Sequence, residues 1–349
     1  MSAKVQIGNR WVGDGEPCFI IAEAGSNHDG KLEQAKQLID IAAIAGADAV
    51  KFQVFRANRL YPRNAGLSDY LKIPKPIYDI IAEMEMPYEW LPQLSAYCQE
   101  KAILFLASVF DEGSADKVDP HVAAFKIASY EMTDIPLIRH VAKKGKPVII
   151  STGTADLDEV TETVDEFRRT GNDCLILMQC TAAYPAPLDS LNIRAVATMK
   201  SIFTVPVGLS DHSSDALTGP LTAVALGANL IEKHFTLSKK MPGPDHRFAL
   251  EPDELRLMVD KAHEIEKTLG DGKKVVQPVE LELREFARRS IFAVRDITIG
   301  ETFTDENVAI LRCGKLKYFL EPKRFPDLLG KLAQRNILAE SAIRKDDYA

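Results

Sequence analysis

Two apolar segments that each end near a histidine offer the clearest chemistry in this sequence. LIEKHFT, residues 230–236, contains His234, and VPVGLSDH, residues 205–212, ends in His212. If the two segments are neighbouring parallel strands, both histidines lie at one mouth, which suits a metal ion or a phosphorylated substrate. The alternative is a pair of unrelated histidines that cap strands or lie satisfied in the core. The elements that would position them therefore have to be found along the whole chain.

Short apolar runs alternate with amphipathic segments along most of the sequence, a pattern typical of parallel βα units. One such segment is helical by its spacing, with Leu32, Ala35, Ile39 and Ala42 on one face. The expected strands lie within residues 18–25, 48–53, 103–110, 123–129, 147–153, 175–181, 205–211 and 230–236. Eight strand and helix pairs over roughly 250 residues predict a (β/α)₈ TIM barrel. A doubly wound open sheet is the alternative, but the GxGxxG turn that often marks it is missing.

Polar side chains follow the expected strands at their carboxyl ends, where barrel enzymes have their active sites. They are Glu23, Lys51, Gln53, Ser108, Lys126, Ser129, Glu131, Ser151, Thr152, Thr181, Tyr184, Ser210, His212, Glu232 and His234. Any one serine is best explained as a strand-terminal residue that satisfies a loop. Lysines inside the strand patterns AVKFQ and AFKIAS are different, because an unpaired ammonium group buried in a strand is too costly without an anionic partner.

Composition limits the kind of partner. The chain has 349 residues, of which 46% are hydrophobic and 27% charged, and its net charge is -7. These values are ordinary for a soluble globular enzyme and argue against a nucleic-acid or acidic membrane surface, so we expect a small-molecule partner. The five cysteines form no close CxxC pair and are expected to be reduced. Neither a signal peptide nor a membrane-spanning stretch is evident, so a cytoplasmic protein is expected.

The pattern changes toward the carboxyl terminus. We predict a barrel domain over residues 1–269, a charged linker over 270–285 and a small β-rich domain over 286–349. The connection 55–86, rich in proline and tyrosine, is expected to fold over the mouth as a substrate loop, with a solvated insertion as the alternative.

The motifs AEAGSNHDG, VKFQ, FKIASYE, ISTG, CTAAYP, GLSDH, EKHFT, GPDHRFALEP and LLGKLAQRNI occur in this order along the chain. Together they resemble the N-acetylneuraminate (sialic acid) synthase family over nearly the whole length. The resemblance implies a barrel followed by an antifreeze-like (SAF) domain. It also implies the condensation of phosphoenolpyruvate with a 2-acylamino sugar aldehyde, which gives a nine-carbon 2-keto acid and phosphate.

The resemblance assigns expected roles to individual residues. His212 and His234 match ligands of a divalent metal, Mn²⁺ or Mg²⁺, and Glu23 matches the carboxylate that handles a proton at the reacting centre. Phosphoenolpyruvate is expected to contact Lys51, Ser108, Lys126, Ser129, Ser151 and Ser210, with Gln53 close by. The sugar is expected to contact Glu131, Tyr184 and Asp245. Arg312 matches an arginine that reaches the sugar's acylamino group in the other barrel of a domain-swapped homodimer.

Two departures from the family pattern leave the sugar open. Arg312 is followed by Cys313 and Gly314 where the family commonly has RPG, and Ala182 and Ala183 stand where sialic acid enzymes often have a polar residue. The expected product is N-acetylneuraminate from N-acetylmannosamine. Legionaminate, pseudaminate or another sugar acid of a surface or spore polysaccharide is the alternative, and the GPDH turn favours the sialic and legionaminic branches. An inactive carbohydrate-binding barrel is the remaining alternative.

Overall fold

The computed structural model describes residues 4–68 and 73–349 of the chain. They form two compact units, which divide between Gly270 and Asp271, next to the predicted end of the barrel domain at residue 269. Within the described residues, no helix combines the length and the apolar character that crossing a membrane requires.

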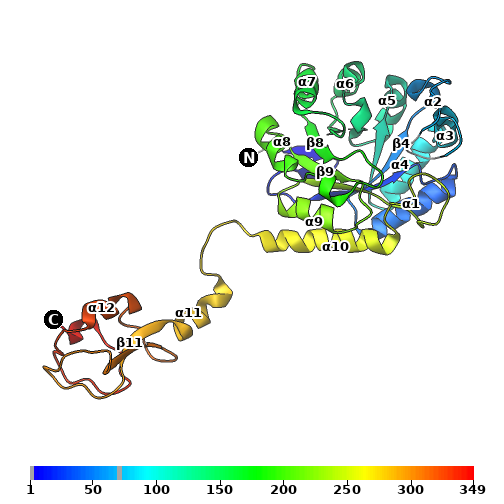
Figure 1. Ribbon diagram of the computed structural model, residues 1–349. Coiled ribbons are helices and arrows are strands. Elements are labelled where there is room, and N and C mark those ends of the chain that lie inside the picture. The colour runs from blue at the N-terminus through cyan, green and yellow to red at the C-terminus, as the bar shows by residue number, and fades with distance from the viewer. Residues whose placement is uncertain (1–3, 69–72) are drawn as a thin grey trace. The chain divides into compact units, whose positions relative to one another are not determined.

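The first unit is built around a closed barrel of parallel strands (Figure 1). The strands follow one another around the barrel in chain order, and β10 closes it by pairing with both β9 and β3. Their bounds are β3 Phe19–Gly25, β4 Ala49–Val54, β5 Leu104–Val109, β6 Phe125–Ile127, β7 Val148–Ser151, β8 Leu175–Cys180, β9 Val207–Asp211 and β10 Leu230–His234. Each barrel strand coincides with a segment predicted to be one, and only β4 runs past its segment, by the single residue Val54. The predicted TIM barrel is therefore confirmed.

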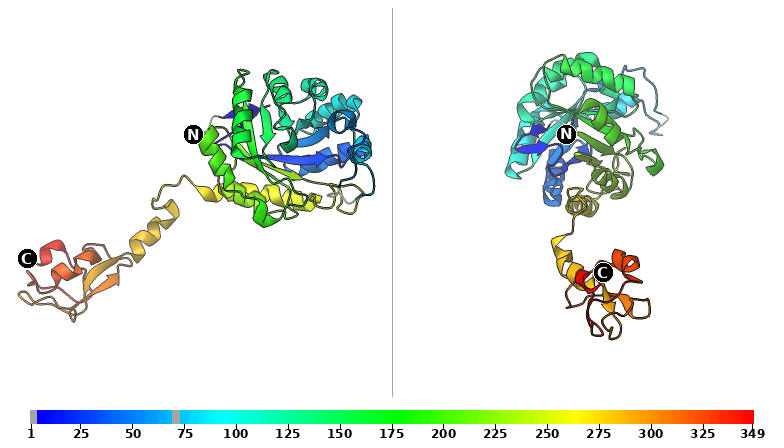
Figure 2. Two further views of the ribbon diagram at one scale, coloured as in Figure 1. Left: turned by 45° about the horizontal axis from the view of Figure 1, so that its top comes forward. Right: turned by 90° about the vertical axis from the view of Figure 1, so that its left-hand side faces the viewer.

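Helices surround the strands on the outside, as the views of Figure 2 show. They are α1 Leu32–Ala45, α2 Ala57–Leu60, α3 Ile77–Glu83, α4 Leu91–Glu100, α5 Glu112–Val118, α6 Ile135–Ala142, α7 Leu157–Arg168, α8 Ala195–Phe203, α9 Thr218–Ala225 and α10 Pro252–Leu269. Their inward faces and the outward-facing strand residues form the main apolar core of the unit, which includes Ile20, Val50 and Leu255. Burial of this apolar surface is what holds the barrel together.

A second apolar cluster fills the inside of the barrel at the end where the strands begin. Phe19, Ile21 and Leu230 belong to it, together with Val5 and Val12 from a hairpin near the amino terminus. This hairpin pairs β1 Val5–Ile7 with β2 Arg10–Val12 in antiparallel register. Because the hairpin covers that end of the barrel with apolar side chains, the mouth at the other end is the place for chemistry.

The connection from β4 to α4 contains the short helices α2 and α3 and a 3₁₀ turn at Tyr88–Trp90. Residues 69–72 of the predicted substrate loop lie outside the described residues. The part that the structure describes includes side chains that line a cavity at the mouth, among them Leu60 and Ile81.

The second unit has a small apolar core, in which Ile291, Phe303 and Leu328 are fully buried. Its strands β11 Arg289–Ala293 and β12 Val308–Arg312 pair antiparallel, and isolated bridges such as Ile297 with Ile337 extend the β structure. The remaining helices are α11 Leu281–Ala287 and α12 Phe325–Leu328. The predicted linker, 270–285, therefore contains a 3₁₀ turn at Pro278–Glu280 and most of α11.

Candidate active site

A layer of polar side chains lies inside the barrel directly above the apolar layer. Successive residues of a strand point to opposite faces, so residue 23 shares the inward face of Phe19 and Ile21, and residue 232 that of Leu230. The same alternation gives one inward residue from each strand: Glu23, Lys51, Ser108, Lys126, Ser151, Cys180, Ser210 and Glu232. All eight are buried. The barrel interior is therefore apolar at one end and polar at the other.

Four charged groups in this layer form a connected set of ion pairs. The Lys51 ammonium lies 2.6 Å from a Glu23 carboxylate oxygen and 3.7 Å from one of Glu232. Lys126 donates to both oxygens of Glu232, at 3.0 and 3.2 Å. The anionic partner that two buried lysines require is thus present within the chain, and the lysines by themselves do not prove an anionic ligand.

Serines and one glutamine complete the hydrogen bonds of this set. Each serine has a single charged partner: Ser108 accepts from Lys51 at 2.8 Å, Ser151 accepts from Lys126 at 2.6 Å and Ser210 donates to Glu232 at 2.9 Å. Gln53, two residues after Lys51 and on the same strand face, donates to Glu23 at 3.1 Å. These neutral donors and the two ammonium groups can supply the hydrogen bonds and the positive charge that a bound phosphate and carboxylate need.

The two glutamates titrate differently because their surroundings differ. Burial raises the pKa of Glu23 to about 7, and Glu232 adds to the rise although Lys51 opposes it. Burial also acts on Glu232, but Lys126 and Lys51 outweigh it and hold the pKa of Glu232 at about 2. Near neutral pH, Glu232 is therefore a fixed anion and Glu23 can take up or release a proton, as a general base or acid must.

His212 and His234 lie side by side at the mouth, as predicted, because β9 and β10 are neighbouring parallel strands. Their ring centroids are 5.3 Å apart. The ring of Tyr184 packs against that of His212 at 4.3 Å, and Phe248 packs against His234 at 5.2 Å. The interpretation of the histidines as unrelated strand caps is therefore wrong.

An outward-facing ion pair fixes the strand ends on which the histidines sit. Lys233 is 1% exposed and donates to Asp211 at 2.6 Å and to the carbonyl oxygen of Ser213 at 2.6 Å. Asp211 and Lys233 immediately precede the two histidines, so this pair ties β9 to β10 at the height of the imidazoles.

The histidines have the properties of metal ligands. Burial lowers the pKa of His212 to about 4, and burial together with His212 lowers the pKa of His234, so both rings are neutral at pH 7, the form that binds metal. The buried Nδ1 of His234 has no hydrogen-bond partner among the described residues. The described residues contain no group of three or more His, Cys, Asp or Glu side chains able to hold an ion. Any metal here would take its remaining ligands from substrate and water, and imidazole donors suit Mn²⁺ better than Mg²⁺.

A cavity of about 380 Å³ opens above the polar layer. Its polar lining includes Gln53, Ser129, Glu131, Tyr184, His234 and Asp245, all of which were predicted to lie at the site. Burial raises the pKa of Glu131 to about 7 and that of Asp245 to about 6. The cavity size is typical of a pocket for a small organic ligand.

Two buried histidines support the loops around this cavity. His246 is 1% exposed; its Nδ1 lies 2.6 Å from the Thr236 hydroxyl and its Nε2 lies 3.0 Å from Asp29. These contacts hold the loop that includes Asp245. Burial lowers the pKa of His28 to about 4, and its ring packs edge-on against Trp90.

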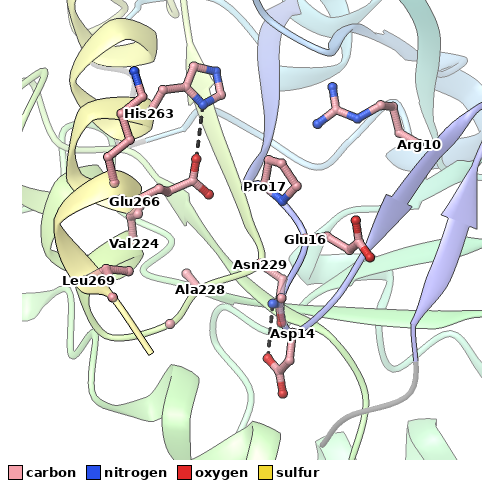
Figure 3. A pocket seen from close by; sticks show the side chains of 14 residues that line it. Arg10, Asp14, Glu16, Pro17, Val224, Ala228, Asn229, His263, Glu266 and Leu269 are labelled. Carbon is pink, nitrogen blue, oxygen red and sulfur yellow. Dashed lines mark hydrogen bonds and ion pairs between the residues drawn. The ribbon is translucent and has the colours of Figure 1, made fainter. Parts of the chain in front are cut away.

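A larger hollow, of about 1050 Å³, lies where the strands begin, since it is lined by residues just before β3 and β10 (Figure 3). Most of its charged groups pair with other protein groups: His263 with Glu266, Asp14 with Lys200, and Arg10 with Asp48. It therefore offers a ligand little beyond groups that are already satisfied. The mouth, with its orphaned imidazole nitrogen and raised carboxyl pKa values, is the better candidate active site.

One predicted site residue belongs to the second unit. Arg312 is exposed at the end of β12 in the second unit and stays a prediction. The strand pattern placed Glu232 at the mouth but gave it no role, and the structure makes it the carboxylate that both lysines share. Cys180 was not predicted as a site residue; its sulfur lies 3.4 Å from the Ser129 hydroxyl and 3.6 Å from His212 Nδ1.

Comparison with known proteins shows which family the chain belongs to. A model of the NeuB family matches residues 38–274, and a SAF domain model matches residues 288–349. The spore coat polysaccharide biosynthesis protein SpsE of Bacillus subtilis is 45% identical over 99% of this chain and 97% of its own length, and its crystal structure matches with a TM-score of 0.68. Pseudaminic acid synthase of Campylobacter jejuni is 38% identical over 99% of this chain and 100% of its own. The crystal structure of sialic acid synthetase from Leptospira borgpetersenii, 35% identical, matches 81% of this chain and 96% of that one with a TM-score of 0.75.

Proposed function

Because the chain belongs to the NeuB family, we propose that it is a sugar acid synthase that condenses phosphoenolpyruvate with N-acetylmannosamine or a related 2-acylamino sugar. The products are a nine-carbon 2-keto acid, N-acetylneuraminate for that sugar, and phosphate. The observation that supports this most strongly is the polar layer of the barrel, with Lys51 and Lys126 among serines, next to two neutral imidazoles and an open cavity.

In this proposal the phosphate and carboxylate of phosphoenolpyruvate lie against the polar layer. Lys51, Lys126, Ser108, Ser151, Ser210 and Ser129 donate to them. Each ammonium group exchanges part of its contact with a glutamate for the substrate, and Ser210 turns its one O–H from Glu232 to the substrate. When all four charged groups are ionised, the two lysines and two glutamates have no net charge. A bound cation would add the positive charge that a strongly anionic substrate needs.

The sugar occupies the cavity, with its aldehyde toward His212 and His234. A divalent ion held by these two imidazoles would polarise the aldehyde oxygen and activate a water. A bond forms between the methylene carbon of phosphoenolpyruvate and the aldehyde carbon, and the aldehyde oxygen takes up a proton to become a hydroxyl. Water adds to carbon two and gives up one proton. The bond from carbon two to the phosphate oxygen then breaks as the new hydroxyl passes its remaining proton to the departing phosphate, which leaves the keto group. Glu23, next to Gln53 and Lys51, takes the proton from that water, and Glu131, Tyr184 and Asp245 orient the sugar.

The test measures sugar-dependent phosphate release and product mass together, with phosphoenolpyruvate, Mn²⁺ and a panel of acylamino sugars. We expect one phosphate for each nine-carbon acid, loss of turnover with a chelator and recovery with Mn²⁺. Glu23→Gln should abolish turnover, while Gln6→Glu, far from the mouth on the exposed face of β1, should not. Absence of sugar-dependent phosphate release across the whole panel would leave the inactive carbohydrate-binding barrel as the better explanation.

A further inference from the structure

The loop from β10 to α10 carries Asp245 to the cavity, and a buried histidine anchors this loop. Asp245 lines the cavity, whereas the next residue, His246, does not and is 1% exposed. The imidazole Nε2 of His246 lies 3.0 Å from Asp29, in the loop after β3, and its Nδ1 lies 2.6 Å from the Thr236 hydroxyl, just after β10. Since β3 and β10 are neighbouring strands, the imidazole links the two loops across the seam where the barrel closes.

Asp29 is itself held in place, so it can serve as the fixed end of this link. Its other carboxylate oxygen accepts a hydrogen bond from Gln34 Nε2 at 2.7 Å, and the same amide donates to the carbonyl oxygen of Asn27 at 2.6 Å. Asn27 donates in turn to the carbonyl oxygen of Phe235 at 2.8 Å. Gln34 is a buried residue of α1, so the link is tied to a helix of the barrel.

The imidazole also supports the turn that precedes Asp245. Gly243 has a φ of +138°, a conformation that side chains rarely adopt, and a β-carbon there would lie 2.8 Å from His246 Cδ2. The backbone of the turn therefore lies directly against the ring. On the other side of His246, Arg247 donates to the carbonyl oxygen of Tyr184 at 3.3 Å. The place of Asp245 thus depends on the histidine that follows it.

The carboxylate that this loop carries faces the groups expected to react. A β-carbon at Gly25 would lie 3.4 Å from Asp245 Oδ2 and 3.6 Å from both Glu23 Oε1 and His234 Cε1. The three side chains therefore face one small space beside the end of β3. An orienting group in such a space must be placed accurately, because an error of about 1 Å can cost roughly a hundredfold in rate.

The order of hydroxyl, imidazole and carboxylate is also that of an activated nucleophile. Thr236 is fully buried, however, and its oxygen accepts a hydrogen bond from the Ser238 amide at 3.2 Å. A substrate cannot reach this hydroxyl. Any effect of the link on the reaction must therefore pass through the loop that it anchors.

We propose that Asp29 and His246 are positioning residues, which hold the Asp245 carboxylate where the sugar half of the reaction needs it. The inference rests on the proposed function and adds to it two residues that do not line the cavity. The lysines and serines expected to bind phosphoenolpyruvate lie on β4 to β9 or just after β6, outside the two linked loops. Weakening the link should therefore act on the sugar and spare phosphoenolpyruvate.

The experiment measures kcat and KM for the best sugar of the panel, and the affinity for phosphoenolpyruvate by calorimetry. Wild type is compared with Asp29→Ala, His246→Ala, the double variant and Asp29→Asn. We expect kcat/KM for the sugar to fall roughly ten- to a hundredfold in the alanine variants. The loss should be smaller in Asp29→Asn, whose amide can still form a hydrogen bond with the imidazole. The affinity for phosphoenolpyruvate should be unchanged in all of them.

Two comparisons separate positioning from general damage. The double variant should be no slower than the slower single variant, because both changes break the same link. His140→Ala is the matched control, since His140 of α6 pairs with Asp116 of α5 at 2.7 Å in an exposed histidine–aspartate pair. It should leave the sugar kinetics at the wild-type value. Melting temperatures are recorded for every variant, and if His246→Ala does not fold, the two Asp29 variants decide.

Three results would overturn the proposal. The first is wild-type sugar kinetics in the alanine variants, and the second is a double variant whose loss is the product of the two single losses. The third is a loss of affinity for phosphoenolpyruvate as large as the loss for the sugar, because the whole mouth would then have loosened. Failure of the proposed function is distinct from all three, since wild type itself would then release no phosphate with any sugar.

Discussion

Replacement of Lys126 by methionine separates the structural from the functional role of the buried charges. The variant leaves the Glu232 carboxylate with the Ser210 hydroxyl at 2.9 Å and with Lys51 at 3.7 Å as its charged partner. Removing one member of a buried ion pair typically costs about 3–5 kcal/mol. With a shift of about 2–4 °C per kcal/mol for a domain of this size class, Lys126→Met should lower the melting temperature by roughly 6–20 °C.

The double variant Lys126→Met/Glu232→Gln supplies the matched comparison. It removes the negative charge of Glu232, which has lost its Lys126 partner, while the new amide can still accept a hydrogen bond from Ser210. Most of the lost stability should therefore return. Affinity for phosphoenolpyruvate should not return, because the ammonium group is still missing. We expect the affinity for phosphoenolpyruvate to fall roughly a hundredfold in both variants, because each lacks one desolvated charge-assisted hydrogen bond to the substrate.

Thermal unfolding followed by circular dichroism and titration calorimetry with phosphoenolpyruvate measure the two effects. Recovery of affinity together with stability in the double variant would contradict a substrate-binding role for Lys126, which would then be only a structural partner of Glu232. An unchanged melting temperature in the single variant would contradict the buried ion pair itself.

The remaining predictions concern other parts of the site. His212→Ala and His234→Ala should each lose calorimetric Mn²⁺ binding while circular dichroism stays native; binding of wild-type strength by either would remove that imidazole as a ligand. The folded pKa of Glu131, about 7, lies above the ordinary 4.5, so its stabilisation is complete below about pH 4.5 and is lost as the pH rises through 7. Glu131→Gln should therefore melt higher than wild type at pH 8 and nearly equally at pH 4.5; an equal difference at both would contradict the raised pKa. Mixing full-length His212→Ala and Arg312→Ala chains should restore part of the activity if Arg312 acts across a swapped dimer, and no recovery after subunit exchange would argue against action in trans.

The barrel and its mouth were predictable because both follow from local patterns. Eight apolar runs gave the strands, and the residues at their carboxyl ends gave most of the mouth, including Lys51, Lys126 and His212. Parallel strands in chain order bring those ends together whatever the side chains do.

Partners and cavities could not be predicted in the same way. The sequence shows that two lysines are buried, but it does not show that Glu232 lies between them, since this depends on closure of the barrel by β10. The hairpin of β1 and β2 was missed because each strand has three residues, too few for a periodic signal. Helix α3, which carries Ile77 and Ile81, was not predicted, because the prolines and tyrosines of its segment indicated only a loop.

The fate of the bridging oxygen of phosphoenolpyruvate shows which of its bonds breaks in the reaction. The chain is incubated with Mn²⁺, an acylamino sugar and phosphoenolpyruvate that has ¹⁸O between carbon two and phosphorus, and phosphate and sugar acid are analysed by mass spectrometry. We expect the phosphate to retain the label and the nine-carbon acid to take its new oxygen from water. Unlabelled phosphate, or labelled phosphate released at the same rate without sugar, would contradict condensation at this mouth.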